Sequence, residues 1–221
     1  MTISKPKPLD EILRYLAGAR RVFLLGCSDC ATVCQVGGKD QLARMAGILQ
    51  EHGKEVTGTL VAEPGCHLLE LKRVLRHQRE QVEAADAVLV LSCGTGAQTA
   101  AAVLSDKPVY PGTDTIFLGQ VQRFGQFAEV CSACGECLLE RTAGVCPVTR
   151  CAKGLLNGPC GGTSAEGKCE VDPEQDCAWK LIYDRLAAMG RLKNLSEYTP
   201  ARDHRKRPGR HLVTREEEGA A

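Results

Sequence analysis

The chain has 221 residues, a length that fits one or two domains. Apolar residues make up 43% of it, enough for a hydrophobic core, and a formal net charge of +1 gives no argument for binding nucleic acid or a membrane surface. No run reaches the roughly 18 apolar residues of a membrane span. The first residues also lack the apolar stretch of a signal peptide. We therefore expect a soluble protein in a reducing cytoplasm.

Cysteine is the residue type that sets this composition apart, with 13 in the chain. In a reducing compartment, cysteines at this density are typical of metal binding. An odd number also does not suit a closed set of disulfides. The sequence therefore predicts thiolate metal sites.

Strand and helix patterns alternate through the first half of the chain. This alternation predicts an α/β fold with an open parallel sheet and helices on both faces. Helical spacing of apolar residues indicates helices over 9–19, 39–53, 68–84 and about 94–104, and short apolar runs indicate strands over 21–26, 55–62, 85–92, 108–110 and 115–118.

The cysteines of this half follow the predicted strands. Crossover helices begin at the carboxyl edge of a parallel sheet, so these thiols should gather where open α/β folds place their ligands. Cys27-x2-Cys30-x3-Cys34 predicts three metal ligands, and Cys93 is preferred to Cys66 as the fourth. The alternative for Cys66 and Cys93 taken singly is a buried structural thiol, because free cysteine packs well in cores.

Two other kinds of site are possible at the same sheet edge, a dinucleotide site and a phosphate site. A dinucleotide-binding fold would carry G-x-G-x-x-G after the first strand, where this chain has GCSDCATVC. The stretch CGTGAQT, which begins at Cys93, could cradle a phosphate, although such turns are common for steric reasons alone. His67 has no convincing nucleophile to pair with, which argues against an independent enzyme.

The stretch from Cys131 to Cys177 holds eight cysteines among glycines, prolines and few apolar residues. Burial alone cannot fold it, because ordering each residue costs about 1–2 kcal/mol of backbone entropy. Four thiolates complete one iron–sulfur cluster or one structural zinc site, so eight cysteines make two sites.

The spacing within this stretch favours one of the two sites. Cys131-x2-Cys134-x2-Cys137 resembles the opening of a bacterial ferredoxin motif, and Cys146-Pro147 resembles its close, which favours a cluster. The sequence separations between the later cysteines match neither the ferredoxin motif nor a zinc motif, so a second cluster and a zinc site are equally supported. These are Cys146, Cys151, Cys160, Cys169 and Cys177.

A last helix is predicted over 176–192. Its stripe of Trp179, Ile182, Leu186 and Met189 is interpreted as core that packs against the cysteine-rich stretch. The chain then turns polar, with a basic run from Arg202 to Arg210 and an acidic run at 216–218, which indicates a solvated tail or a docking arm. We divide the chain into 1–127, an α/β domain; 128–192, a metal-binding domain; and 193–221, a polar tail.

The run RTAGVCPVTRCAKGLLNGPCGGTSAEGKCEVDPEQDCAWKLIYDRL resembles the C-terminal domain of methylenetetrahydrofolate reductase, because LLNGPCGG, GKCEV and CAW occur together and in order. The resemblance covers roughly 131–190. The upstream half looks like the small MetV-type subunit of the acetogenic enzyme. The resemblance implies an iron–sulfur subunit with two [4Fe-4S] clusters, and zinc as a further metal, that pairs with a MetF-type FMN-bearing catalytic subunit in the Wood–Ljungdahl pathway.

The chain departs from an entire reductase in lacking the (β/α)8 barrel of about 250 residues that would hold folate and FMN. The implied role is therefore electron transfer without catalysis, from a donor such as ferredoxin or a larger oxidoreductase assembly to the partner's FMN. The alternative is a non-redox scaffold, whose metals only fold the chain and hold the catalytic subunit in place.

Overall fold

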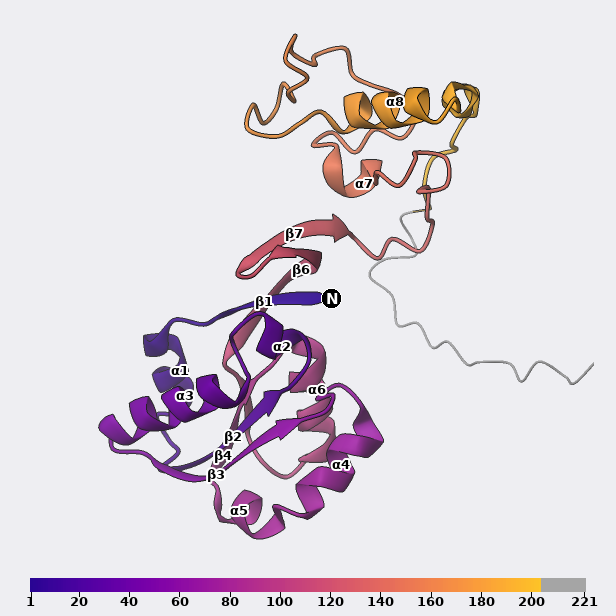
Figure 1. Cartoon of the computed structure of the whole chain (residues 1–221). Coiled ribbons are helices and arrows are strands. Elements are labelled where there is room, and N and C mark those ends of the chain that lie inside the picture. The colour runs from indigo at the N-terminus through magenta and orange to yellow at the C-terminus, as the bar shows by residue number, and fades with distance from the viewer. Residues whose placement is uncertain (204–221) are drawn as a thin grey trace, which may run out of the picture. The chain divides into compact units, whose positions relative to one another are not determined.

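The computed structural model describes residues 1–203. The predicted acidic run and the basic run after Arg202 lie outside these residues. The chain divides into two compact units, Met1–Val130, called the sheet unit, and Cys131–Ala221, called the cysteine-rich unit (Figure 1). Among the described residues, no helix combines the length and the apolar character needed to cross a membrane.

The sheet unit is built on a four-stranded parallel sheet in the order β3-β2-β4-β5. Its helices lie on both faces, so the predicted α/β architecture is confirmed (Figure 1). The strands are β2 (Arg21–Cys27), β3 (Glu55–Ala62), β4 (Ala87–Leu91) and β5 (Val109–Pro111), and the helices are α1 (Leu9–Tyr15), α2 (Cys30–Val33), α3 (Lys39–Glu51), α4 (Leu68–Arg76), α5 (Arg79–Ala84) and α6 (Gly94–Val103).

Two apolar cores lie on the two faces of this sheet, because successive side chains of a strand point to opposite faces. From β2, Val22 and Leu24 enter the core under α1 and α3, whereas Phe23 and Leu25 enter the core under α4, α5 and α6. Strand β4 alternates in the same way and all its residues are buried. Burial on both faces explains why β2 and β4 read as continuous apolar runs.

A second sheet was not predicted. It is three-stranded, in the order β1-β6-β7, with β1 (Thr2–Pro6) antiparallel to β6 (Thr113–Arg123). Strand β7 (Gln126–Cys131) follows β6 after the residues Phe124 and Gly125, and the φ of +73° at Gly125 suits the tight turn. The predicted strand over 115–118 is thus a fragment of a much longer hairpin. The single helix predicted over 68–84 is also wrong, since α4 and α5 are separate.

Over its described residues, 131–203, the cysteine-rich unit has little regular structure. It contains α7 (Pro147–Arg150), α8 (Ala178–Ala188) and the 3-10 helix η1 (Leu192–Ser196). Its core is formed by Val145, Cys177, Trp179, Ile182 and Leu186. Three of the four residues of the predicted stripe on α8 are therefore buried. Met189 is not, with 56% of its surface exposed, because it follows the end of the helix.

Candidate functional site

Five cysteines of the sheet unit stand at the carboxyl ends of β2, β3 and β4, and we call them the N-terminal cysteine group. Cys27 ends β2, Cys30 begins α2 and Cys34 follows it, while Cys66 and Cys93 follow β3 and β4. Because these three strands are parallel neighbours, their carboxyl ends share one edge of the sheet. The structure places all five thiols where the sequence predicts a ligand site.

Close backbone contact holds the cysteine loop after β2 against the sheet. A Cβ on Gly26 would lie 2.2 Å from the carbonyl oxygen of Gly37, and one on Gly37 would lie 1.7 Å from that of Leu91. Neither position can carry a side chain without displacing the backbone. Cys27 N–H also donates to the Gly37 carbonyl at 3.0 Å, which closes the loop that carries Cys30 and Cys34.

The thiols of this group lie near enough to influence one another. Burial raises the pKa of the Cys34 thiol, and the neighbouring Cys30 and Cys93 raise it further. Desolvation is also the largest cause of the raised pKa of the Cys66 thiol. The charge of Cys93 raises this pKa further, and those of Cys27 and Cys30 add smaller contributions. Like charges at close range disfavour ionisation, so a bound cation is what would let several thiolates form together.

The second sheet supplies an apolar floor beneath two of these cysteines. Ile3 of β1, Phe117 of β6 and Phe127 of β7 pack with Cys27 and Cys34, which are 7% and 9% exposed. The Cys34 thiol lies 3.8 Å from the carbonyl oxygen of Thr2. Sequence reasoning missed these residues, and the signal for them is weak because β1 carries a single apolar residue other than proline.

The alternative sites at this edge find less support. The Gly94 N–H, which a phosphate would need, donates to Thr115 Oγ1 at 2.7 Å. Gly96 has a packing role, since a Cβ there would lie 2.4 Å from Ser92 Oγ. His67 is exposed and caps α4, with its Nδ1 accepting the Glu70 N–H at 3.2 Å.

In the cysteine-rich unit, four cysteines line a single cavity, and we call them the quartet. The cavity has a volume of about 20 Å³, which is room for about one water-sized atom. Its wall also includes Thr163 and Trp179. The sequence could not assign these cysteines to one site, and the structure brings them together: Cys151, Cys160, Cys169 and Cys177.

Local structure shapes the quartet and its charge. Lys168 and Asp176 form an isolated antiparallel bridge and an ion pair at 2.8 Å, which closes the loop between Cys169 and Cys177. Desolvation opposes ionisation of Cys177, but the Thr163 hydroxyl and the N–H groups at the start of α8 lower its pKa overall. A helix N-terminus is a favourable place for a thiolate because its free N–H groups point at the sulfur.

Three of the remaining cysteines, Cys131, Cys134 and Cys137, lie in one loop, here called the Cys131 loop. Ala133 and Gly135, on either side of Cys134, have φ of +50° and +78°, so the chain turns tightly around that thiol. The Ala133 N–H donates to Cys131 Sγ at 3.3 Å. Cys146 immediately precedes α7 and is not among the residues that line the quartet cavity.

The described residues contain no group of three or more Cys, His, Asp or Glu side chains that is already arranged to hold a metal ion. Metal binding would therefore draw the thiols of a group together, as it does where binding and folding are coupled. The four sulfur atoms need not lie as close together for an iron–sulfur cluster as for a single ion, because each thiolate binds a different iron.

Comparison with known proteins bears on the second half of the chain. Residues 110–205 match the family model described as the C terminal of methylene-tetrahydrofolate reductase. This match confirms the resemblance found in the sequence and extends it upstream over β6 and β7. Comparisons with curated proteins and with solved structures gave no match.

Proposed function

We propose that this protein is the MetV-type iron–sulfur subunit of a methylenetetrahydrofolate reductase complex. Its role is to pass electrons to the FMN of a MetF-type catalytic subunit, in the reaction that serves the Wood–Ljungdahl pathway. The family match over 110–205 supports the link to the reductase. The convergence of five thiols at one sheet edge is the observation that carries the redox role.

The residues fit two [4Fe-4S] clusters and one zinc ion. Four thiols of the N-terminal cysteine group suit one cluster, and the Cys131 loop together with Cys146 suits the second. A single-ion cavity makes zinc the better occupant of the quartet. Bound clusters would supply one-electron transfer, by which a donor such as ferredoxin could reduce a flavin in two single-electron steps before the flavin passes an electron pair to folate.

Each part of the chain has a defined task in this proposal. The buried Cys27 and Cys34 and their apolar floor exclude water from one side of the N-terminal site, which affects the potential of a cluster. Within residues 1–203, the parallel sheet has four strands rather than the eight of a closed barrel. We therefore assign folate and FMN to the partner, and the electron donor to a ferredoxin or a larger oxidoreductase.

A non-redox scaffold is the second candidate. It is favoured by the small core of the cysteine-rich unit, which would depend on metal to fold whether or not electrons pass through it. In that case the surface of the protein would hold the catalytic subunit, and iron would be unnecessary.

Metal analysis of the anaerobically purified protein separates the two. We expect about eight irons with matching sulfide and about one zinc per chain, and an EPR signal after reduction. Zinc without iron would reject the electron-transfer role.

Single serine substitutions then test the N-terminal site. Cys30→Ser should remove about four irons and slow FMN reduction in the complex. Comparing Cys66→Ser with Cys93→Ser identifies the fourth ligand, because only one of the two should lose iron. Full iron and unchanged electron delivery in Cys30→Ser would exclude this cluster from the route.

A further inference from the structure

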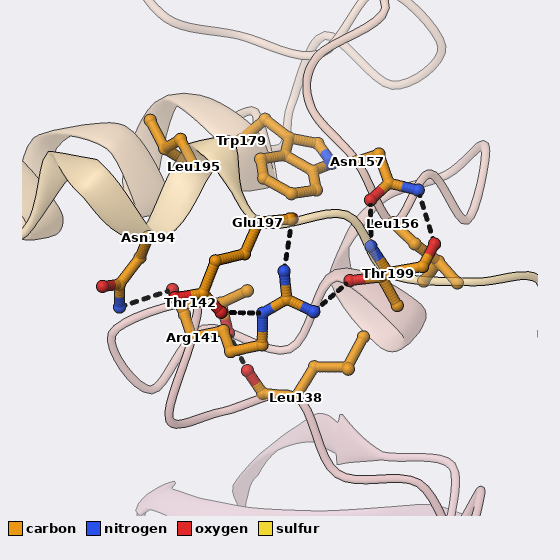
Figure 2. A pocket seen from close by; sticks show the side chains of 10 residues that line it. All are labelled: Leu138, Arg141, Thr142, Leu156, Asn157, Trp179, Asn194, Leu195, Glu197 and Thr199. Carbon is orange, nitrogen blue, oxygen red and sulfur yellow. Dashed lines mark hydrogen bonds and ion pairs between the residues drawn. The ribbon is translucent and has the colours of Figure 1, made fainter.

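The segment 197–202, which we call the strap, follows η1 and packs against the cysteine-rich unit. The Asn157 side chain holds its Thr199 by two hydrogen bonds, accepting the Thr199 N–H at 2.7 Å and donating to its carbonyl at 2.8 Å. This pairing imitates a bridge between two strands (Figure 2). Thr199 is 8% exposed, so the strap is part of the packed unit at this point.

Arg141 binds the same segment through hydrogen bonds and an ion pair. Its guanidinium donates to the Thr199 hydroxyl at 2.8 Å and to the Glu197 carbonyl, and its Nε lies 3.3 Å from the Glu197 carboxylate (Figure 2). The Arg141 side chain is 17% exposed and that of Glu197 61%, so the ion pair itself is open to solvent and the hydrogen bonds to Thr199 and to the Glu197 carbonyl are the better-shielded part of the network. The cavity among these groups is only about 20 Å³, so the network is a clamp rather than a ligand pocket.

The clamped strap leads directly to Arg202, which lies against the Cys131 loop. Arg202 Nη2 donates to the Cys134 carbonyl at 3.0 Å, and its Nε lies 3.7 Å from the carboxylate of Glu136. The side chain is 13% exposed.

We propose that Arg202 is a positioning residue for the metal site at the Cys131 loop. The strap holds its guanidinium against Cys134, where it fixes the loop and stabilises negative charge on the site. This inference rests on the proposed function, since it concerns a site that is to carry electrons. Nothing in the basic run as read from the sequence distinguished Arg202 from the arginines that follow it.

The physical effect follows from charge. A reduced cluster carries one more negative charge than an oxidised one, so a nearby cation and its hydrogen bonds favour reduction. Arg202 should therefore raise the reduction potential of this site above the value it would have without the guanidinium. Lysine keeps the charge but not the planar fork that reaches a carbonyl and a carboxylate together, so Arg202→Lys should lie between the wild type and Arg202→Gln.

The test is an EPR-monitored redox titration of the full chain, purified anaerobically, with iron content measured on the same samples. For Arg202→Gln we expect the ratio of reduced to oxidised cluster at a fixed potential to fall about tenfold, which is about 59 mV for one electron. Asn157→Ala, which frees the strap, should shift the ratio in the same direction by less.

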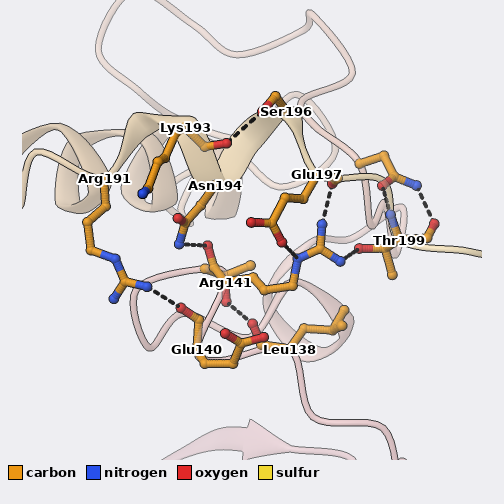
Figure 3. A network of polar contacts seen from close by, with 11 residues as sticks. Leu138, Glu140, Arg141, Arg191, Lys193, Asn194, Ser196, Glu197 and Thr199 are labelled. Atoms are coloured by element: carbon orange, nitrogen blue, oxygen red, sulfur yellow. Dashed lines mark hydrogen bonds and ion pairs between the residues drawn. The ribbon is translucent and has the colours of Figure 1, made fainter.

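Arg191→Gln is the matched control. Arg191 also donates to a backbone carbonyl of this unit, that of Glu140 at 3.5 Å, and its loss removes the same charge (Figure 3). We expect it to leave both potential and iron unchanged. Loss of about four irons from Arg202→Gln, with full iron in Arg191→Gln, would also support the proposal because the loop would then no longer be held.

Two results would overturn it, and each is distinct from failure of the proposed function. One is full iron with an unchanged potential in Arg202→Gln, and the other is an equal shift in Arg191→Gln. A wild-type protein that holds zinc but no iron would instead overturn the proposed function, and the role of Arg202 in redox tuning with it.

Discussion

The two units of this protein are stabilised in different ways. The sheet unit has an apolar core on each face of its parallel sheet and a third beneath its cysteines. The cysteine-rich unit has one small core, in which a cysteine takes one of the five buried positions. Its other residues, as far as residue 203, lie mostly in irregular loops. The sheet unit can therefore be folded by burial, whereas we expect the cysteine-rich unit to need a ligand bound by its thiols, as in the proposed function.

This difference separates two uses of cysteine. At the edge of the parallel sheet, the thiols lie on a framework that is packed without them, so loss of a metal bound there should have little effect on the fold. In the quartet, the ligands come from loops that only a small bridge at Lys168 and Asp176 holds together. Metal bound at the quartet would therefore contribute directly to the folding free energy of this unit.

Removal of bound metal should produce the largest difference in stability between the two units. Under anaerobic treatment with a strong chelator, we expect hydrogen–deuterium exchange in α8 and in 151–177 to become fast, while amides of β2 and β4 stay protected. Exchange followed by mass spectrometry measures both units in one sample. Equal loss of protection in the two units would mean that the sheet unit also requires metal.

Truncating one core residue in each unit should destabilise that unit and leave the other unit unchanged. Trp179→Ala should cost the cysteine-rich unit about 3–5 kcal/mol, because the side chain is buried and its Nε1–H donates to the Leu155 carbonyl at 3.0 Å. Phe23→Ala should cost the sheet unit a similar amount. Denaturant-dependent hydrogen exchange assigns each loss to its unit. If either variant weakened both units equally, the two would unfold as one.

The fully buried elements were predictable from the sequence, and the reason is physical. Strands β2 and β4 are apolar throughout because helices cover both faces, so their pattern does not depend on any distant residue. Strand β1 has only Ile3 to mark it, and its partner β6 lies more than 100 residues away, so nothing local indicates the pair. The break between α4 and α5 at His77 and Gln78 likewise carries no glycine or proline.

The candidate sites also differ in how far the sequence predicts them. The positions of the N-terminal cysteine group followed from topology, since the order of strands and helices alone puts them at one edge. The grouping of the quartet could not be read from its spacing, because hairpin and helix contacts between loops bring those cysteines together. Arg202 contacts the Cys131 loop at the end of a strap that Asn157 and Arg141 hold, and the sequence pattern contains no sign of these contacts.

A smaller effect is expected from adding one methyl group beneath the N-terminal site. Gly37→Ala would place a Cβ 1.7 Å from the Leu91 carbonyl oxygen, so the loop that carries Cys30 and Cys34 must shift. Overpacking of this kind costs about 1–3 kcal/mol. We expect lower iron content with the sheet largely retained, measured by iron assay and far-UV circular dichroism.

Gly47→Ala is the control for that change, since a Cβ at Gly47 in α3 meets nothing within 4 Å. It should keep full iron and stabilise the helix by up to about 1 kcal/mol. Equal iron in both variants would show that the close approach at Gly37 does not position the cysteine loop.

The smallest effect should come from the opposite edge of the same sheet. Asp86 joins the starts of β2 and β4, accepting the Arg21 N–H at 2.8 Å and pairing with its guanidinium at 2.9 Å. The Arg21 side chain, followed by the backbone N–H groups of Arg21 and Arg20, lowers the pKa of Asp86 to about 2. The usual value in an unfolded chain is about 3.9.

Because the folded pKa lies below the unfolded one, this carboxylate stabilises the fold above about pH 4, and the benefit disappears as the pH falls toward 2. Asp86→Asn should therefore melt slightly below the wild type from pH 8 to 5, with a gap that narrows below pH 4. Asp106→Asn, at an exposed turn, should show no such gap. A gap that widened on acidification would assign the pH dependence to another group. A gap confined to acid would show that the ion pair at the strand starts adds nothing at neutral pH, leaving burial alone to hold the edge remote from the cysteines.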